Sequence, residues 1–200
     1  MSILFCMVRT RTFDPSTALT SVMDLFASKG YSETSMEDIV QATGVSRYGL
    51  YNEFGNKREL FEQALERFAD RMGRQSFLRL LEPDASLDHI RGLFADRVTD
   101  MCSIEERKGC LFVHTAMELA PQDEEIRGVL HKFIKRMSKA FSIGLESAKE
   151  RGEIRQDVDV RAAGELLTST MFGLAVLGRT GFEESALHGV VESTLASLTD

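Results

Sequence analysis

The sequence predicts an all-α protein of about nine helices, with a small N-terminal three-helix unit and a larger helical C-terminal domain. Through most of the chain, apolar residues recur at the i, i+3, i+4 spacing that places them on one face of a helix. The 200 residues include only three prolines, which rarely interrupt this pattern. No alternating polar and apolar run is long enough to indicate a strand.

The first helix of the N-terminal unit begins after Asp14, whose carboxylate can cap the free amides of a first turn. Pro15 suits that turn because a first-turn amide has no partner in the helix. The inward stripe consists of Ala18, Leu19, Val22, Leu25 and Phe26. Gly30 ends the helix, and we expect Tyr31 to pack beneath the helices that follow.

Two short helices joined by a glycine turn come next. Thr34 and Ser35 can both cap the first, and Asp38 stands three residues after Ser35, as in a capping box. Gly44 ends this helix, because glycine reaches positive φ without steric cost. Ser46 caps the second helix, which directs Leu50 and Phe54 inward.

The second short helix leaves five residues facing solvent, Arg47, Tyr48, Gly49, Tyr51 and Asn52. Two tyrosines and an arginine outside the core are not explained by packing. A helix, a tight turn and a second helix with such a face is the arrangement that enters the DNA major groove. The alternative is an ordinary helical hairpin with a solvated face.

The stretch from Ser32 to Leu60 resembles the DNA-binding domain of the TetR family of bacterial transcriptional regulators. The residues in step with the family pattern are Thr34, Ile39, Val40, Gly44, Val45, Ser46, Leu50, Tyr51, Phe54, Lys57 and Leu60. The resemblance implies that Arg47, Tyr48 and Gly49 contact base edges. It implies that phosphates are held by Thr34, Ser35, Tyr51, Asn52 and Lys57. Glu53 stands where many family members have histidine, so a phosphate contact there is in doubt.

The C-terminal domain is predicted to contain six helices. They span about 57–81, 87–101, 110–121, 123–151, 160–177 and 183–198. The helix at 110–121 is apolar almost all round, so we expect it to be buried. The predicted organisation is therefore an N-terminal arm over 1–13, a helix-turn-helix domain over 14–56, and a ligand-binding and dimerisation domain over 57–200.

The last two helices have more apolar surface than one small protomer needs. The resemblance implies that they form a four-helix bundle with a second copy. Packing within one protomer is the alternative. The predicted interface residues are Leu166, Thr170, Gly173, Leu174, Leu177, Val190, Val191 and Leu195.

A ligand cavity between the middle helices is expected from the family rather than from spacing. Its candidate lining is Phe94, Met101, Cys110, Phe112, His114, Met117, Phe133, Met137, Phe141 and Met171. The alternative is that these side chains form ordinary core, with His114 a hydrogen-bonded core histidine. Cys110 begins a helix and follows Arg107 and Lys108, which would favour a reactive thiolate. The alternative for Cys110 is a buried, inert side chain.

The formal net charge is −7, whereas phosphate contacts come from basic residues. The N-terminal region nevertheless contains a local basic group, Arg9, Arg11, Arg47, Lys57 and Arg58. Residues 1–13 are expected to form a flexible basic arm, or else a solvated tail. The run from Met7, MVRTRTFDPSTAL, resembles family N-termini more than the six residues before it, so Met7 is a candidate start.

Three cysteines without a CxxC pair favour a reduced, cytoplasmic setting, and the N-terminus fits neither a signal peptide nor a membrane span. No nucleotide, hydrolase or metal-ligand motif is found, so we expect no enzyme activity, no cofactor and no metal.

The predicted function is a ligand-responsive transcriptional regulator. We expect a homodimeric repressor that binds a palindromic operator in double-stranded DNA and is released by a small-molecule effector. No membrane partner is expected. The alternative is a helical redox or electrophile sensor that uses Cys110, with or without DNA binding.

Overall fold

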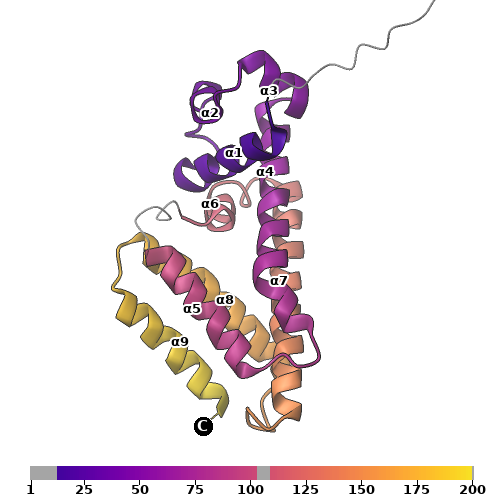
Figure 1. The fold of residues 1–200 in the computed structure, drawn as a ribbon, viewed down its shortest axis with the longest axis vertical. Helices are drawn as coiled ribbons and strands as arrows, with labels where there is room; N and C mark the ends of the chain where they lie inside the picture. The colour runs from indigo at the N-terminus through magenta and orange to yellow at the C-terminus, as the bar shows by residue number, and fades with distance from the viewer. Residues whose placement is uncertain (1–12, 103–108, 200) are drawn as a thin grey trace, which may run out of the picture.

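The computed structural model describes residues 13–102 and 109–199, and within these ranges the chain forms nine α-helices and no strand (Figure 1). The prediction of an all-α fold is confirmed. The helices are α1 (Pro15–Lys29), α2 (Met36–Thr43), α3 (Arg47–Phe54), α4 (Lys57–Met72), α5 (Leu87–Cys102), α6 (Leu111–Glu118), α7 (Glu124–Glu150), α8 (Val160–Arg179) and α9 (Glu184–Thr199). Residues 1–12, including Arg9 and Arg11 of the predicted arm, lie outside the described residues.

The predicted caps of the N-terminal unit are present. Asp14 accepts hydrogen bonds from the amides of Ser16 and Thr17, at 3.2 and 3.0 Å. Ser35 and Asp38 form a reciprocal capping box at the start of α2. Gly44 has the left-handed φ of 67° that a helix C-terminus favours. These local contacts fix where α1, α2 and α3 begin and end.

An aromatic cluster holds the N-terminal unit on α4. The ring of Phe61 on α4 lies 5.0 Å from that of Phe26 and 4.9 Å from that of Tyr31. Phe26 and Phe61 are fully buried, and Tyr31 packs beside them. Aromatic contacts in this range add to the free energy gained by burial alone. The start of α4 therefore moves with the helix-turn-helix.

α4 ends earlier than predicted. It stops at Met72 and is followed by one π-helical turn, Gly73–Phe77, and a 3₁₀ turn, Leu78–Leu81. The next buried apolar residue after Met72 is Phe77, five positions on, so a regular α-helix would turn it out of the core. The π turn instead places Phe77 against Phe141 of α7, with ring centroids 5.6 Å apart.

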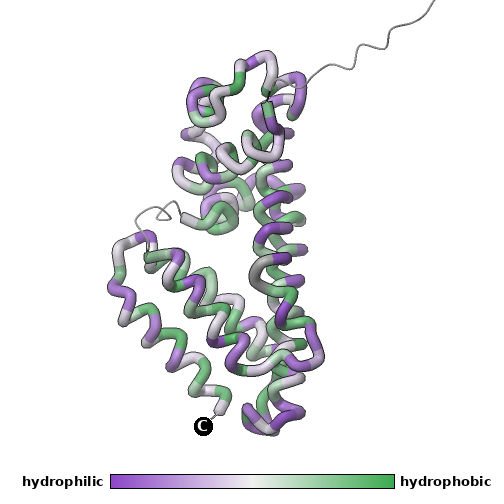
Figure 2. The backbone as a smooth tube through the Cα atoms, viewed as in Figure 1, coloured by the Kyte–Doolittle hydropathy of each residue, from purple (hydrophilic) through white to green (hydrophobic). Residues whose placement is uncertain are grey.

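The C-terminal domain is organised around the long helix α7, which runs beside α4 and packs on α8 (Figure 1). α5 and α9 pack on α8 and on each other. Figure 2 shows hydrophobic and hydrophilic positions interleaved along α5, α8 and α9, as expected for helices with one buried face.

α6 lies between the two domains, in contact with α1, α4, α7 and α8. The prediction that this helix is buried all round is wrong. Leu111, Phe112 and Thr115 are buried, but the Met117 side chain is 78% exposed. A helix wedged at a domain boundary has solvent on one side, and Met117 lies on that side.

Candidate functional site

The exposed face of α3 is the candidate DNA-contacting surface. Arg47, Tyr48, Tyr51 and Asn52 are all exposed, with Tyr48 72% and Tyr51 43% accessible. Leu50 and Phe54, on the opposite side, are buried and hold the helix against the unit. The spacing i, i+1, i+4, i+5 gathers the exposed residues on one side of the helix. α3 therefore presents hydrogen-bond donors and acceptors on a firmly packed helix.

Arg47 is paired with an acidic residue of α2. Its Nη2 lies 2.5 Å from Oε1 of Glu37, and the two side chains are 51% and 75% exposed. An ion pair this accessible contributes little because water screens both charges. The guanidinium can therefore exchange Glu37 for a guanine edge at small cost.

Gly49 has a structural explanation that the sequence did not suggest. A Cβ at this position would lie 3.0 Å from Cγ1 of Val45 and 3.3 Å from Oγ of Ser46. The missing side chain lets the first turn of α3 pack tightly against the glycine turn before it. The contact of Gly49 with a base stays a prediction, and only backbone atoms of Gly49 can make it.

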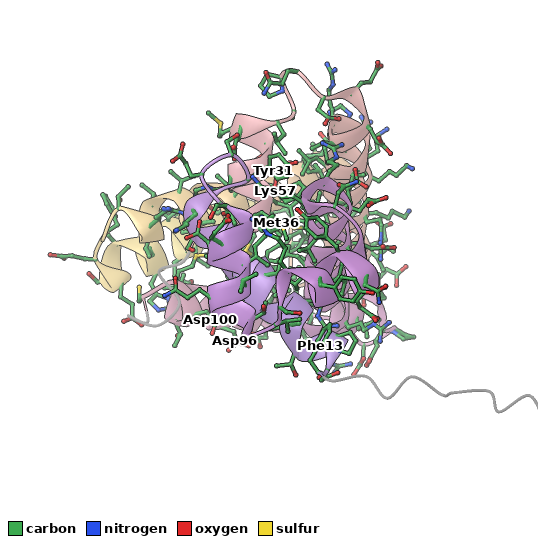
Figure 3. All side chains as sticks on the ribbon, turned by 90° about the horizontal axis from the view of Figure 1, so that it is seen from above. Phe13, Tyr31, Met36, Lys57, Asp96 and Asp100 are labelled. Atoms are coloured by element: carbon green, nitrogen blue, oxygen red, sulfur yellow. The ribbon has the colours of Figure 1, made fainter. Side chains whose placement is uncertain are left out.

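The predicted phosphate ligands differ in their accessibility. Thr34 is fully buried and its hydroxyl donates to the carbonyl of Gly30 at 2.6 Å, so its assignment as a phosphate ligand is wrong. Ser35 is exposed, with its hydroxyl in the capping box. The Lys57 ammonium lies 4.4 Å from the centre of the Tyr31 ring, and Figure 3 shows the two residues side by side.

A cavity of about 100 Å³ lies within the C-terminal domain, between α4, α5, α7 and α8. Five predicted residues line it, Met101, Cys110, Phe133, Met137 and Met171. Three others do not line it and are packed against other rings in the core: Phe94, Phe112 and Phe141. Met117 faces solvent, so its assignment to the cavity is wrong.

Sequence reasoning missed the charged part of the cavity lining. It consists of Arg71, Arg97, Asp100 and Arg179, and the further apolar lining is Phe68, Met72, Phe172 and Ala175. Arg97 and Asp100 form an ion pair along α5. The available signal was weak: arginines that border apolar stripes of helices more often remain in solvent.

Arg179 connects this cavity to the N-terminal unit. It ends α8 and donates to the carbonyls of Ala27 and Ser28 in α1, at 3.2 and 2.9 Å. It also contacts Nε2 of His114, which lies beside the cavity rather than in it. Burial, and then the Arg179 charge, lowers the pKa of His114. His114 is therefore a neutral acceptor at this junction.

Glu118, one turn after His114, holds the turn between α1 and α2. Its carboxylate accepts from the amides of Tyr31 and Ser32, at 2.8 and 2.6 Å. Burial raises the pKa of Glu118, but the hydrogen bonds from Ser32 and Tyr31 outweigh it and the net shift is downward. Glu118 therefore stays ionised and ties α6 to the helix-turn-helix.

Arg58 joins α4 to α7 within the C-terminal domain. Predicted as part of a basic surface, it instead forms ion pairs with Glu62 of its own helix and with Asp123, the capping residue of α7. These two carboxylates hold its guanidinium away from a DNA-facing role.

Cys110 does not have the properties of a reactive thiol. It caps α6 without a side-chain hydrogen bond to the helix, and burial raises the pKa of its thiol above the ordinary value. The thiolate is the nucleophile, so a raised pKa lowers reactivity. Arg107 and Lys108, expected to favour the thiolate, lie outside the described residues.

The predicted dimer residues fall into two groups. Leu174, Val191 and Leu195 are buried within the protomer by the packing of α8 on α9, so assigning them to the interface is wrong. Leu166, Gly173 and Val190 are exposed, while Thr170 and Leu177 are half-buried. Val176, which was not predicted, is 48% exposed on the same side of α8.

By length and composition alone, α8 is long and apolar enough to cross a membrane. One third of its most apolar stretch is buried in the protomer. Its buried positions, such as Leu167 and Met171, face the core. An added side chain at Gly173 on α8, or at Gly189 on α9, would meet open space. The outer sides of α8 and α9 thus have room for close approach by another helix.

The fold and the exposed α3 face define a helix-turn-helix transcriptional regulator. A family model described as bacterial regulatory proteins, tetR family, matches residues 19–64, and one described as tetracyclin repressor-like, C-terminal domain, matches residues 86–194. The chain belongs to the TetR family. This family and the relatives described below are transcription regulators and not enzymes.

Similarity to known regulators extends over nearly the whole chain. The chain is 28% identical over 193 residues to the uncharacterized HTH-type transcriptional regulator YezE of Bacillus subtilis, covering 96% of this chain and 100% of YezE. It is 29% identical over 188 residues to the HTH-type transcriptional repressor ComR of Escherichia coli, covering 94% of this chain and 90% of ComR.

A solved structure places a similar chain on DNA. The TetR family regulator CifR, in a cysteine-substituted form complexed with 26 bp double-strand operator DNA, has a TM-score of 0.83 and 28% identity. The match covers 95% of this chain and 99% of that chain.

Proposed function

We propose that this regulator is a homodimeric repressor that binds a palindromic operator in the cytoplasm and is released by a small-molecule effector. The observation that carries the proposal is the exposed α3 face, with Arg47, Tyr48, Tyr51 and Asn52 on a helix that Leu50 and Phe54 anchor. A helix presented in this way fits a major groove about 12 Å wide.

The dimer proposal rests on the outer side of α8 and α9. Leu166, Val176 and Val190 are exposed apolar side chains there, and Gly173 leaves room for a partner helix. Burying such a surface against a second copy removes apolar area from water. Two-fold symmetry then presents two α3 helices to two half-sites about one helical turn apart.

Effector response is supported by the cavity and its position. The cavity lies among α4, α5, α7 and α8, and Arg179 in its wall contacts α1 directly. An effector that binds better to a conformer with a different α1 position shifts the population away from the DNA-binding form. We place the boundary between the DNA-binding and effector domains at residues 56 and 57, where α4 begins.

A footprint on the DNA flanking the protein's own gene tests the proposal. The wild-type protein should protect a palindrome, and Arg47→Ala should lose protection because one base contact is worth about 1–3 kcal/mol in each half-site. Arg161→Ala is the matched control, since Arg161 is an exposed arginine at the start of α8, in the C-terminal domain. Protection that survives in Arg47→Ala would contradict the assignment of Arg47.

A further inference from the structure

The cavity is basic although the protein is acidic. Among the described residues that line it, three are arginines and one is an aspartate, and the others are uncharged. The whole chain has a formal net charge of −7. An excess of arginine in the lining of one pocket of such a chain is not a consequence of composition.

Two of the arginines are placed to receive an anion. Arg97 and Asp100 satisfy each other through their ion pair. Arg71 is exposed, lies 5.8 Å from the centre of the Phe68 ring, and makes no ion pair with the described residues. Among its contacts, Arg179 donates to two main-chain carbonyls and touches His114, a neutral side chain. A carboxylate is a stronger acceptor for a guanidinium than a main-chain carbonyl or a neutral imidazole is.

The remaining lining determines the rest of the ligand. Phe133, Met137 and Met171 provide an apolar wall, and methionine side chains adapt their shape to what they contact. An apolar cavity of about 150 Å³ holds one benzene molecule, and ordinary ligand pockets span about 300–1,000 Å³. At about 100 Å³, this cavity is smaller than the one that holds benzene, so it suits a short chain.

We propose that the effector is a small organic monocarboxylate. Its carboxylate lies against Arg71 and Arg179, and its apolar part lies against Phe133, Met137 and Met171. This proposal rests on the effector response proposed above and names the chemical class of the effector.

The contacts of Arg179 explain how a ligand in the cavity affects the DNA-binding unit. Arg179 is bonded to the carbonyls of Ala27 and Ser28, in the last turn of α1. A carboxylate in the cavity competes with these carbonyls for the guanidinium. Drawing Arg179 into the cavity removes two hydrogen bonds from the end of α1, three residues before Tyr31, whose amide donates to Glu118.

The test uses matched pairs of probes on the purified full-length protein. Butyrate, hexanoate, octanoate and benzoate are each compared with their primary amides at constant ionic strength, by thermal unfolding and by calorimetric titration. The best carboxylate should raise Tm by about 3–5 °C at a tenfold excess over its Kd, and its amide should not.

Variants locate the carboxylate. Arg71→Gln and Arg179→Gln should each weaken carboxylate binding by about tenfold or more, because a charge-assisted hydrogen bond is lost. Arg74→Gln, an exposed arginine outside the cavity lining, should leave Kd unchanged. Arg71 makes no described ion pair, so its variant should fold normally even if Arg179→Gln does not.

Three results would overturn the proposal: no carboxylate of the panel shifts Tm, the amides bind as well as the acids, or Arg71→Gln binds with wild-type affinity. The footprint keeps the two proposals distinct. Protected DNA with no carboxylate binding rejects this effector class alone. Carboxylate binding by a protein that protects no DNA rejects the operator proposal alone.

Discussion

The hydrogen bonds to Glu118 should be the main contact between α6 and the helix-turn-helix. The variant Glu118→Ala tests this expectation. The carboxylate receives the amides of Tyr31 and Ser32 at 2.8 and 2.6 Å. It also lies so close to Gly30 that a Cβ there would approach Oε2 to 2.8 Å. Removing the carboxylate leaves both amides of the turn without their acceptor.

The expected cost follows from these two bonds. A hydrogen bond to a charged group contributes about 1.5–3 kcal/mol. Glu118 is half-buried and the Ser32 amide bond is exposed, so water replaces part of the loss. We therefore expect local opening of the turn to become easier by roughly 1–2 kcal/mol, which corresponds to about a five- to thirtyfold rise in the open population.

Amide hydrogen exchange measured by NMR reports this opening directly. In Glu118→Ala, the amides of Tyr31 and Ser32 should exchange about five- to thirtyfold faster. Glu146→Ala is the matched control, because Glu146 is an exposed glutamate in the last turns of α7. Exchange rates at the two amides within about twofold of wild type would refute the role assigned to Glu118.

Three further predictions concern the core, the pH response and the dimer. Phe141→Ala should lower the free energy of unfolding by about 3–5 kcal/mol in urea titrations, since Phe141 is fully buried between aromatic rings. The lowered pKa of His114 means that its contribution to stability is complete above about pH 6.5 and is lost as pH falls through the folded-state pKa, so His114→Gln should flatten that part of the stability profile. Val176→Asp should yield monomers in sedimentation experiments, whereas Leu78→Asp, at a similarly exposed apolar residue outside α8 and α9, should not.

Helix boundaries were predictable because local chemistry sets them. Asp14, Ser35 and Ser46 cap helices in the structure as the sequence indicated, and each does so through atoms within three residues. The end of α4 was not predictable in this way. Whether the chain continues as an α-helix or makes a π turn depends on Phe141, which lies 64 positions away from Phe77.

The candidate site likewise has features that the local sequence determines and features that depend on distant residues. The outward direction of Arg47, Tyr48 and Tyr51 follows from the helical period and from the burial of Leu50. The burial of Thr34 does not, because it depends on a hydrogen bond to Gly30 at the end of another helix. Arg179 illustrates the limit: its contacts with α1 join residues more than 150 positions apart in the sequence.

The acidic net charge limits non-specific attraction to DNA, because the helix-turn-helix domain is itself acidic. Residues 13–56 contain six acidic side chains and two basic ones, Lys29 and Arg47. Few phosphate contacts mean weak non-specific binding, since that binding is almost entirely electrostatic. Recognition then depends on base contacts from α3, so operator affinity should respond more strongly to Arg47→Ala than non-specific affinity does.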